Sequence, residues 1–210
     1  MIESEQPDTA RLTFTVLDDF HDDPDEVRAF ALSCEYVTAW GSWSGLHSLE
    51  RALDTKTSLF RIAALVSRKS PNWEEIDASY NFWKKAACGS FAASFESQSG
   101  VIHAHRRSGD WAGVIYMSRQ ADCEGRQGTI FYRHKETGLE SVSQVDEEII
   151  RRVSEDARNV AAWEITRIVP MQYNRLVVFD SRYLHSASPG FGSRIDNCRL
   201  IQVFNFCLQQ

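Results

Sequence analysis

Hydrophobic and polar positions follow both helical and strand periods in the first half of the chain. Residues 11–17 alternate apolar and polar side chains, which predicts a strand. A helix is expected to begin at Pro24, because a capping aspartate precedes it and proline is tolerated at the first helical position. Residues 41–47 include two glycines and predict an irregular loop. Apolar residues at turn spacing predict a second helix over 72–85, and a strand is expected over 90–96.

The second half is dense in strands that turn-rich segments separate. Strands are predicted at about 101–105, 111–117, 128–134, 175–180 and 199–207. One helix interrupts them at about 146–163, where apolar residues share a face. Early helices and late strands predict an α+β fold in a single domain, 1–210. The helix-rich part, about 1–88, is expected to buttress a double-sheeted barrel or jelly roll at about 89–207.

Size and charge narrow the class of protein. A chain of 210 residues with 43% hydrophobic content can bury a sizeable core. The formal net charge of -6 argues against a nucleic-acid partner, because phosphate contacts need a clustered basic surface. The longest apolar runs are far shorter than a membrane span, and the acidic N-terminus has no apolar signal region. No membrane partner is therefore expected.

The cysteines indicate a reducing compartment. They are odd in number, widely scattered and never arranged as Cys-x-x-Cys, which favours neither a disulfide framework nor a thiolate zinc site. The five are Cys34, Cys88, Cys123, Cys198 and Cys207. A cytoplasmic location is the simplest expectation.

Two histidines one residue apart are the best lead to chemistry. If the segment 101–105 is extended, His103 and His105 point to the same face, about 7 Å apart along the strand. Neutral histidine is the commonest metal ligand, and two aligned imidazoles plus a distant third can hold a first-row metal with open positions. The plainer interpretation is that both are half-buried polar residues on a strand.

Two residues further along the chain could complete such a site. His185 follows a buried strand and a turn, beside a loop of small residues, which is a common setting for functional side chains. Arg199 begins the last apolar strand and could grip a carboxylate with its planar fork. On spacing alone, a surface arginine at a strand end is slightly favoured for Arg199.

In order and spacing, these residues resemble the iron(II)- and 2-oxoglutarate-dependent oxygenases, in particular a small bacterial branch of that superfamily. The segments that carry the resemblance are 16–20, 103–105, 110–116, 128–134, 174–192 and 199–206. The resemblance implies a double-stranded β-helix, or jelly roll, with His103 and His185 as iron ligands. It implies that Arg199 binds the distal carboxylate of 2-oxoglutarate. Tyr116 would hydrogen-bond the same cosubstrate, or is an ordinary aromatic residue on a strand.

The chain departs from the family pattern at one ligand. His105 stands where the family has an aspartate, so three neutral imidazoles would leave iron(II) at +2 before the cosubstrate binds. A set of three histidines also resembles cupin-fold dioxygenases that need no 2-oxoglutarate. Asp110 could instead fold back to supply the carboxylate, or the chain could be a noncatalytic ligand-binding relative. We expect His103, His105 and His185 to bind the iron.

The resemblance implies the reaction class and the partners. O₂ would oxidise a small organic substrate, by hydroxylation or a related C–H oxidation coupled to 2-oxoglutarate. A homodimer is compatible with the sequence. His47 and His134 could contact the substrate, although exposed loop or strand-end positions are the expectation for both.

Overall fold

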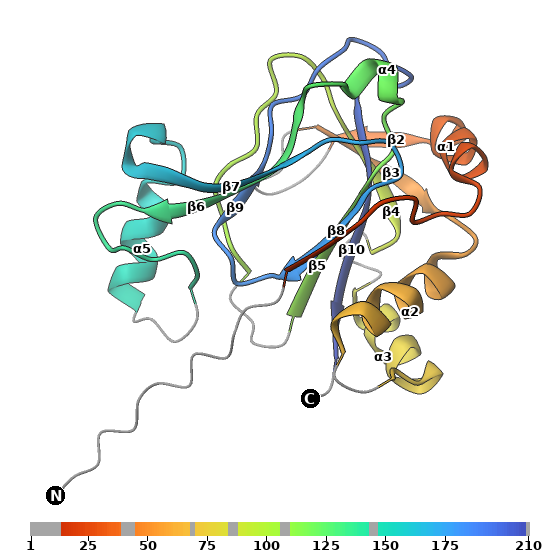
Figure 1. The fold of residues 1–210 in the computed structure, drawn as a ribbon, viewed down its shortest axis with the longest axis horizontal. Helices are drawn as coiled ribbons and strands as arrows, with labels where there is room; N and C mark the ends of the chain where they lie inside the picture. Colours follow the sequence, from red (N-terminus) through yellow and green to blue (C-terminus); the bar gives the residue numbers. More distant parts are fainter. Residues whose placement is uncertain are drawn as a thin grey trace, which may run out of the picture.

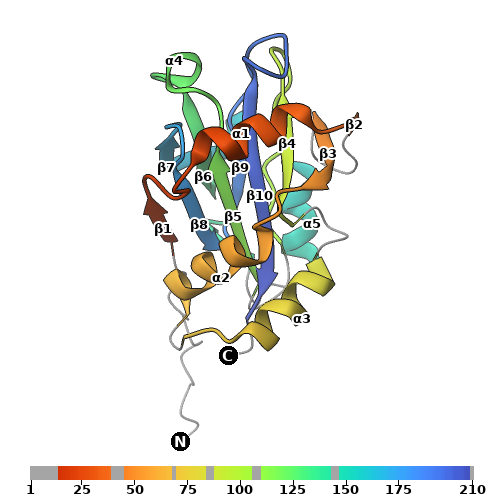
Figure 2. The same ribbon diagram turned by 90° about the vertical axis from the view of Figure 1, so that its right-hand side faces the viewer.

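The computed structural model places two antiparallel sheets face to face, with helices on both outer sides (Figure 1; Figure 2). It describes residues 14–38, 45–67, 70–83, 88–105, 110–142 and 147–208. Within these ranges the fold is mixed α/β with a large antiparallel sheet. No helix in them is long and apolar enough to cross a membrane. All five cysteines are free thiols.

The larger sheet has seven strands in the order β1-β8-β5-β10-β4-β3-β2. Their bounds are Phe14–Leu17 (β1), Leu176–Asp180 (β8), Asp110–Tyr116 (β5), Arg199–Cys207 (β10), Ser90–Ser94 (β4), Leu46–Arg51 (β3) and Tyr36–Thr38 (β2). Every neighbouring pair is antiparallel. The central strands β4 and β8 are buried along their whole length, because other layers cover both faces of this sheet.

The smaller sheet has three strands in the order β7-β6-β9. They are Trp163–Pro170 (β7), Gln127–His134 (β6) and His185–Ala187 (β9). Beyond β9, His103 joins the free edge through an isolated antiparallel bridge to His185. A segment that precedes β5 is therefore attached to the strand that carries the third histidine.

Helices complete a four-layer arrangement. The helices α1 (Pro24–Ser33), α2 (Thr55–Val66) and α3 (Trp73–Trp83) lie on the outer side of the larger sheet (Figure 2). The helix α5 (Glu147–Glu155) packs outside the smaller sheet, where Val153 joins a cluster with Ile130 and Trp163 (Figure 1). Two short helical turns, α4 (Gln120–Cys123) and η2 (Val160–Ala162), lie in connections.

Alternation along β8 shows how the layers are assembled. Leu176 and Val178 belong to the core beneath the helices, whereas Val177 and Phe179 belong to the core between the sheets. Because successive side chains of a strand point to opposite faces, one apolar run serves both cores. The odd-numbered positions of β8 therefore face the interior between the sheets.

Most of the predicted strands are present. Those expected at 111–117, 128–134, 175–180 and 199–207 are β5, β6, β8 and β10, each within one residue of the predicted ends. Of the strand expected at 90–96, residues 90–94 form β4. The first strand is observed at 14–17 and the helix at 72–85 is observed at 73–83, with 11–13 and 84–85 outside the described residues.

Three predictions are wrong. Residues 101–105 form no regular strand, because only His103 pairs with β9 and the backbone of His105 bonds to a turn instead. The helix expected to reach 163 ends at Glu155, and Trp163 starts β7, whose pairing with β6 overrides local propensity. The loop expected at 41–47 gives way to β3 from Leu46, whereas 41–44 lie outside the described residues.

Several elements were not predicted, among them α2 and β7. Polar residues on the buried face of α2 obscure its apolar stripe: Thr55 bonds to Ala52 O and Ser58 bonds to the Asp54 carboxylate. Strand β7 alternates only over 163–166 and then breaks at Arg167, and five consecutive residues along its middle are exposed.

Gly128→Ala should destabilise the fold by about 1–3 kcal/mol, the usual cost of overpacking. A Cβ at Gly128 would collide with the buried Tyr116 hydroxyl and come within 2.8 Å of Val169 O. Gly113→Ala is the matched control, since its Cβ would lie 3.4 Å from its nearest neighbour, Phe204 Cβ. Urea unfolding followed by circular dichroism measures both. Equal midpoints for the two variants would contradict the close approach at Gly128.

Candidate metal centre

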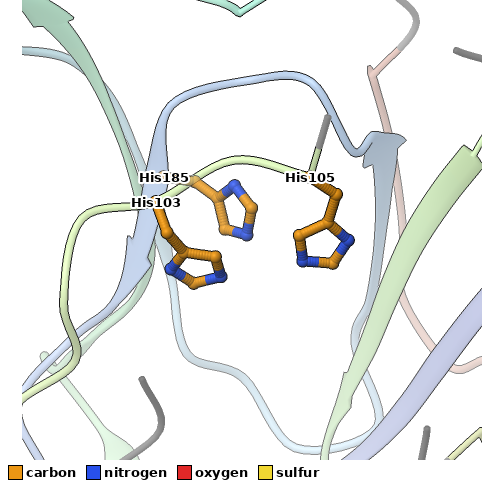
Figure 3. A group of neighbouring side chains, drawn as sticks. All are labelled: His103, His105 and His185. Carbon is orange, nitrogen blue, oxygen red and sulfur yellow. The ribbon is translucent and has the colours of Figure 1, made fainter. Parts of the chain in front are cut away.

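Three imidazoles converge beside β9 (Figure 3). One ring nitrogen from each of His103, His105 and His185 lies within 4.8 Å of the other two. The ring of His103 is 4.4 Å from that of His185 and 5.6 Å from that of His105, centroid to centroid. His185 is buried, and the other two are half-buried. We call these three residues the histidine triad.

Backbone hydrogen bonds fix the positions of the triad. His103 N–H donates to His185 O and His185 N–H donates to His103 O, both at 2.9 Å. Two residues later, His105 N–H donates to Ser181 O at 2.8 Å, in the turn between β8 and β9. His103 and His105 are thus attached to the two ends of the same turn. This attachment brings their rings to His185 without a regular strand.

Side-chain hydrogen bonds favour one tautomer in two of the rings. His103 Nδ1 lies 2.8 Å from Val101 O, and His185 Nδ1 lies 2.7 Å from Tyr183 O. A carbonyl oxygen only accepts, so Nδ1 carries the proton in each ring and Nε2 keeps its lone pair. Metal-ligating histidines are usually oriented by such a bond from their other nitrogen. The donor set therefore fits a divalent first-row metal ion.

The electrostatic setting keeps all three rings neutral. Burial lowers the pKa of His103, and it lowers the pKa of His105 to about 4, with a further contribution from the charge of His103. The pKa of His185 lies well below its ordinary value, chiefly because of burial and then because of the two neighbouring imidazoles. Neutral rings have free lone pairs for a metal, so protons compete little for these ligands.

The triad includes no carboxylate among the residues that the structure describes. The acid in the adjoining turn, Asp180, is engaged by Arg182, with Oδ1 2.8 Å from Nε and Oδ2 2.5 Å from Nη2. Asp110, which could have folded back toward the histidines, begins β5 opposite Cys207, and its side chain lies outside the described residues. The described ligand set is therefore three imidazoles.

Arg199 lies inside the protein and not on its surface. It begins β10, is 1% exposed, and donates from Nη2 to Gly128 O at 3.2 Å. The expectation of a surface arginine at a strand end is therefore wrong. Burial lowers the pKa of Arg199, and the Tyr116 phenol acts in the opposite direction. Tyr116 is also fully buried, its hydroxyl bonds to Thr129 Oγ1 at 2.8 Å, and burial raises its pKa to about 12.

Aromatic rings and one hydroxyl complete the surroundings of the triad. The rings of Phe179 and Phe131 lie 4.7 Å and 6.3 Å from that of His185. Ser181, whose carbonyl receives His105 N–H, is 0% exposed, and its hydroxyl has no hydrogen-bond partner within the described ranges. Sequence reasoning missed these residues, because β8 is apolar on both faces and its sequence does not show which face Phe179 takes.

The other two candidate histidines lie elsewhere. His134 is 0% exposed, with its ring nitrogens 3.1 Å from the Asp156 carboxylate and 3.0 Å from Thr137 Oγ1. His47 is half-buried within β3. The expectation that both are exposed is wrong. Trp163 and Asp156 contact His134 at the end of β6. His47 lies opposite Ala92, a residue of the core between the sheets. Neither belongs to the triad.

Comparisons with known proteins found one family model that matches part of the chain. Residues 100–189 match a family of unknown function (DUF6445), and this segment includes the whole triad but ends before Arg199. No curated protein sequence matches the chain.

Solved structures similar to the chain include two non-haem α-ketoglutarate-dependent enzymes and a hydroxylase. The α-ketoglutarate-dependent epimerase SnoN from nogalamycin biosynthesis is 12% identical, with a TM-score of 0.48, over 94% of this chain and 79% of that chain. A Pseudomonas putida prolyl-4-hydroxylase is 16% identical, with a TM-score of 0.46, over 96% and 95%. The carbocyclase SnoK is 12% identical, with a TM-score of 0.47, over 93% and 79%.

The free energy of unfolding of the metal-free chain should fall as the pH drops from about 6.5 to about 4. In this window the unfolded chain protonates His105, whereas the folded chain keeps it neutral. The stabilising contribution of neutral His105 is fully present above the pKa that His105 has in the unfolded chain. It is lost as the pH falls through the pKa that His105 has in the folded chain. His105→Gln should therefore lose less stability than the wild type, as measured by urea unfolding at several pH values. An NMR titration that gives His105 a pKa near its ordinary value would contradict the depressed pKa.

Proposed function

We propose that the chain is a non-haem iron(II) oxygenase that oxidises a small organic substrate with O₂ and uses 2-oxoglutarate as cosubstrate. The observation that carries the proposal is the histidine triad, in which two rings are oriented by carbonyls and all three are held neutral. Neutral imidazoles suit iron(II), and three protein ligands leave coordination positions open.

His103, His105 and His185 would hold the iron. When bound, it would supply the activation of O₂, which no side chain can supply. The protein would hold the rings, keep them unprotonated and restrict water at the buried His185 side. Ser181 would offer its unpartnered hydroxyl to a ligand beside His105.

The charge of the proposed iron site and the burial of Arg199 favour 2-oxoglutarate as the cosubstrate. Three neutral imidazoles leave iron(II) at +2, which a dianionic ligand can neutralise. Arg199 is buried, and the planar fork of its guanidinium suits a carboxylate. Tyr116 lies close enough to Arg199 to influence its pKa and would sit beside the same carboxylate.

The sheet topology is compatible with the jelly roll that the family resemblance implies. In that assignment, residues 101–105 would form the outermost strand of the smaller sheet, reduced here to the His103 bridge. His185 would begin the neighbouring strand, and Arg199 the strand that returns to the larger sheet. The triad and Arg199 would then both line the interior between the sheets.

One observation favours a second candidate function. His105 replaces the expected carboxylate, and three-histidine dioxygenases bind their substrate without 2-oxoglutarate. Formation of succinate separates the two candidates. O₂ uptake that depends on a substrate but yields no succinate would favour the cosubstrate-free dioxygenase. Absence of both metal binding and O₂ uptake would favour a noncatalytic ligand-binding protein.

The wild type should bind one iron(II), and alanine at any triad histidine should lower the affinity by more than about a hundredfold. This follows because even outer-shell partners of metal ligands are worth about 10–100-fold. His105→Asp should preserve binding, because it exchanges one ligand for another and lowers the charge of the site by one. Anaerobic calorimetric titration of iron(II) measures these affinities.

The matched control for the iron titration is His47→Gln, which changes a half-buried histidine outside the triad. It should bind iron as the wild type does. Undiminished iron affinity in His105→Ala would show that His105 is not a ligand. Stoichiometric iron in a variant without all three histidines would remove the basis of the proposed function.

Arg199→Ala should spare iron binding and weaken 2-oxoglutarate binding by about 2–5 kcal/mol, the usual cost of removing one partner of a buried charge pair. Arg199→Lys keeps the charge but loses the planar fork, so it should lie between alanine and the wild type. Titration of 2-oxoglutarate into the iron-loaded variants measures this, with circular dichroism to verify folding. Unchanged 2-oxoglutarate affinity in both variants would point to the cosubstrate-free dioxygenase.

A further inference from the structure

The register of the smaller sheet places an arginine in one row with a triad histidine. Phe131 of β6 is paired with His185 of β9 on one side and with Arg167 of β7 on the other. Residues directly opposite each other in a sheet share a face. Arg167, Phe131 and His185 therefore form a row across the face that points toward the larger sheet.

A second row faces the first from the larger sheet. Phe14 of β1 is paired with Phe179 of β8. The ring of Phe14 lies 5.2 Å from that of Phe131, and the ring of Phe179 lies 5.0 Å from Phe131 and 4.7 Å from His185. Aromatic contacts thus run without interruption from Phe14 on the edge strand β1 to His185 of the triad.

Arg167 stands at the outer end of these rows. Its guanidinium lies over the Phe14 ring, 4.4 Å from the centroid, and its side chain is exposed. Within the described ranges, no hydrogen bond or ion pair of this guanidinium with another residue is found, whereas Arg133 on the neighbouring strand binds Glu140 and Glu164. A cation–π contact leaves the in-plane N–H donors available to an acceptor from solution.

Tyr183 lies beside the same end of the rows. Its ring is 5.6 Å from that of Phe131, it is half-buried, and the charge of Arg167 acts to lower its pKa against the raising effect of burial. Arg167, Phe14 and Tyr183 therefore group a free cation with two partly exposed aromatic rings. A ligand that suits this group carries an anion next to an apolar or aromatic body.

We propose that Arg167 binds a carboxylate on the substrate, whose apolar body lies along Phe14 and Tyr183 and extends toward the histidine triad. The assignment rests on the proposed function only in taking the triad as the reacting centre. Arg199 is a separate anion site, because it is fully buried and contacts Gly128, which lies three residues from Phe131 and so about 10 Å along β6. The two arginines would hold two different carboxylates.

Strand spacing limits the length of this substrate. Arg167 and His185 are separated by two interstrand distances, roughly 10 Å between backbones. The oxidised carbon would therefore lie about one ring and a short alkyl chain from the carboxylate. Arylalkanoates such as 3-phenylpropionate and 5-phenylpentanoate, with their matched alcohols, are suitable probes because each pair differs only in charge and headgroup.

The test is calorimetric titration of these probes into the full-length metal-free chain, in which no metal can bind the carboxylate. At least one carboxylate should bind more tightly than its alcohol. Arg167→Gln should weaken carboxylate binding by about tenfold or more, as expected when a charge-assisted bidentate bond is lost, and should leave the alcohols unchanged. Arg126→Gln is the matched control, because Arg126 lies 4.3 Å over the Phe191 ring and should leave both probe classes unchanged.

Three outcomes would overturn the assignment. They are failure of every carboxylate to bind the wild type, equal carboxylate binding in Arg167→Gln and the wild type, and loss of binding in Arg199→Lys in place of Arg167→Gln. These results are independent of the iron titration. If Arg167→Gln weakens carboxylate binding but the wild type binds no iron, the carboxylate site is supported and the proposed oxygenase function is contradicted. If the wild type binds iron and forms succinate but Arg167→Gln binds the carboxylates equally well, the oxygenase function is supported and this substrate class is contradicted.

Discussion

The reciprocal backbone hydrogen bonds between His103 and His185 are the constraint on which the site depends. They attach an otherwise irregular segment to the edge of the smaller sheet, and the bond from His105 N–H to Ser181 O fixes that segment two residues later. Three imidazoles from distant parts of the chain then meet, although only one of them begins a strand. Loss of this attachment would free two of the three candidate ligands at once.

Desolvation determines the electrostatic character of the interior. Burial keeps the three imidazoles neutral and also encloses the guanidinium of Arg199, while no acid belongs to the triad among the described residues. A divalent ion bound by the triad would add two positive charges beside three neutral rings. Such an interior favours anionic ligands over neutral ones, because uncompensated buried charge is costly. The proposed cosubstrate follows from this preference, whereas the proposed substrate carboxylate rests on the exposed Arg167.

The two sheets give the two arginines different roles. Arg199 begins a central strand of the larger sheet and is enclosed on all sides, whereas Arg167 lies on an edge strand of the smaller sheet and remains open to solvent. Arg199 contacts Gly128, three residues from Phe131 along β6, so the deep anion site and the outer anion site can be occupied by different molecules.

The sequence by itself determined the features that depend on local pattern. Apolar runs between turn-rich segments identified β5, β6, β8 and β10, and residue type singled out His103, His105, His185 and Arg199 as candidates, whose roles in binding metal and cosubstrate remain predictions. Features that depend on partners distant in the chain were decided only by the tertiary structure. Residues 101–105 lack regular pairing because His105 N–H donates to Ser181 O, in a turn 76 residues away. Strand β7 pairs with β6 although five consecutive residues along it are exposed. The burial of Arg199 and the alignment of Arg167 with His185 likewise follow from strand register, which hydrogen bonds between distant segments set and no local periodicity records.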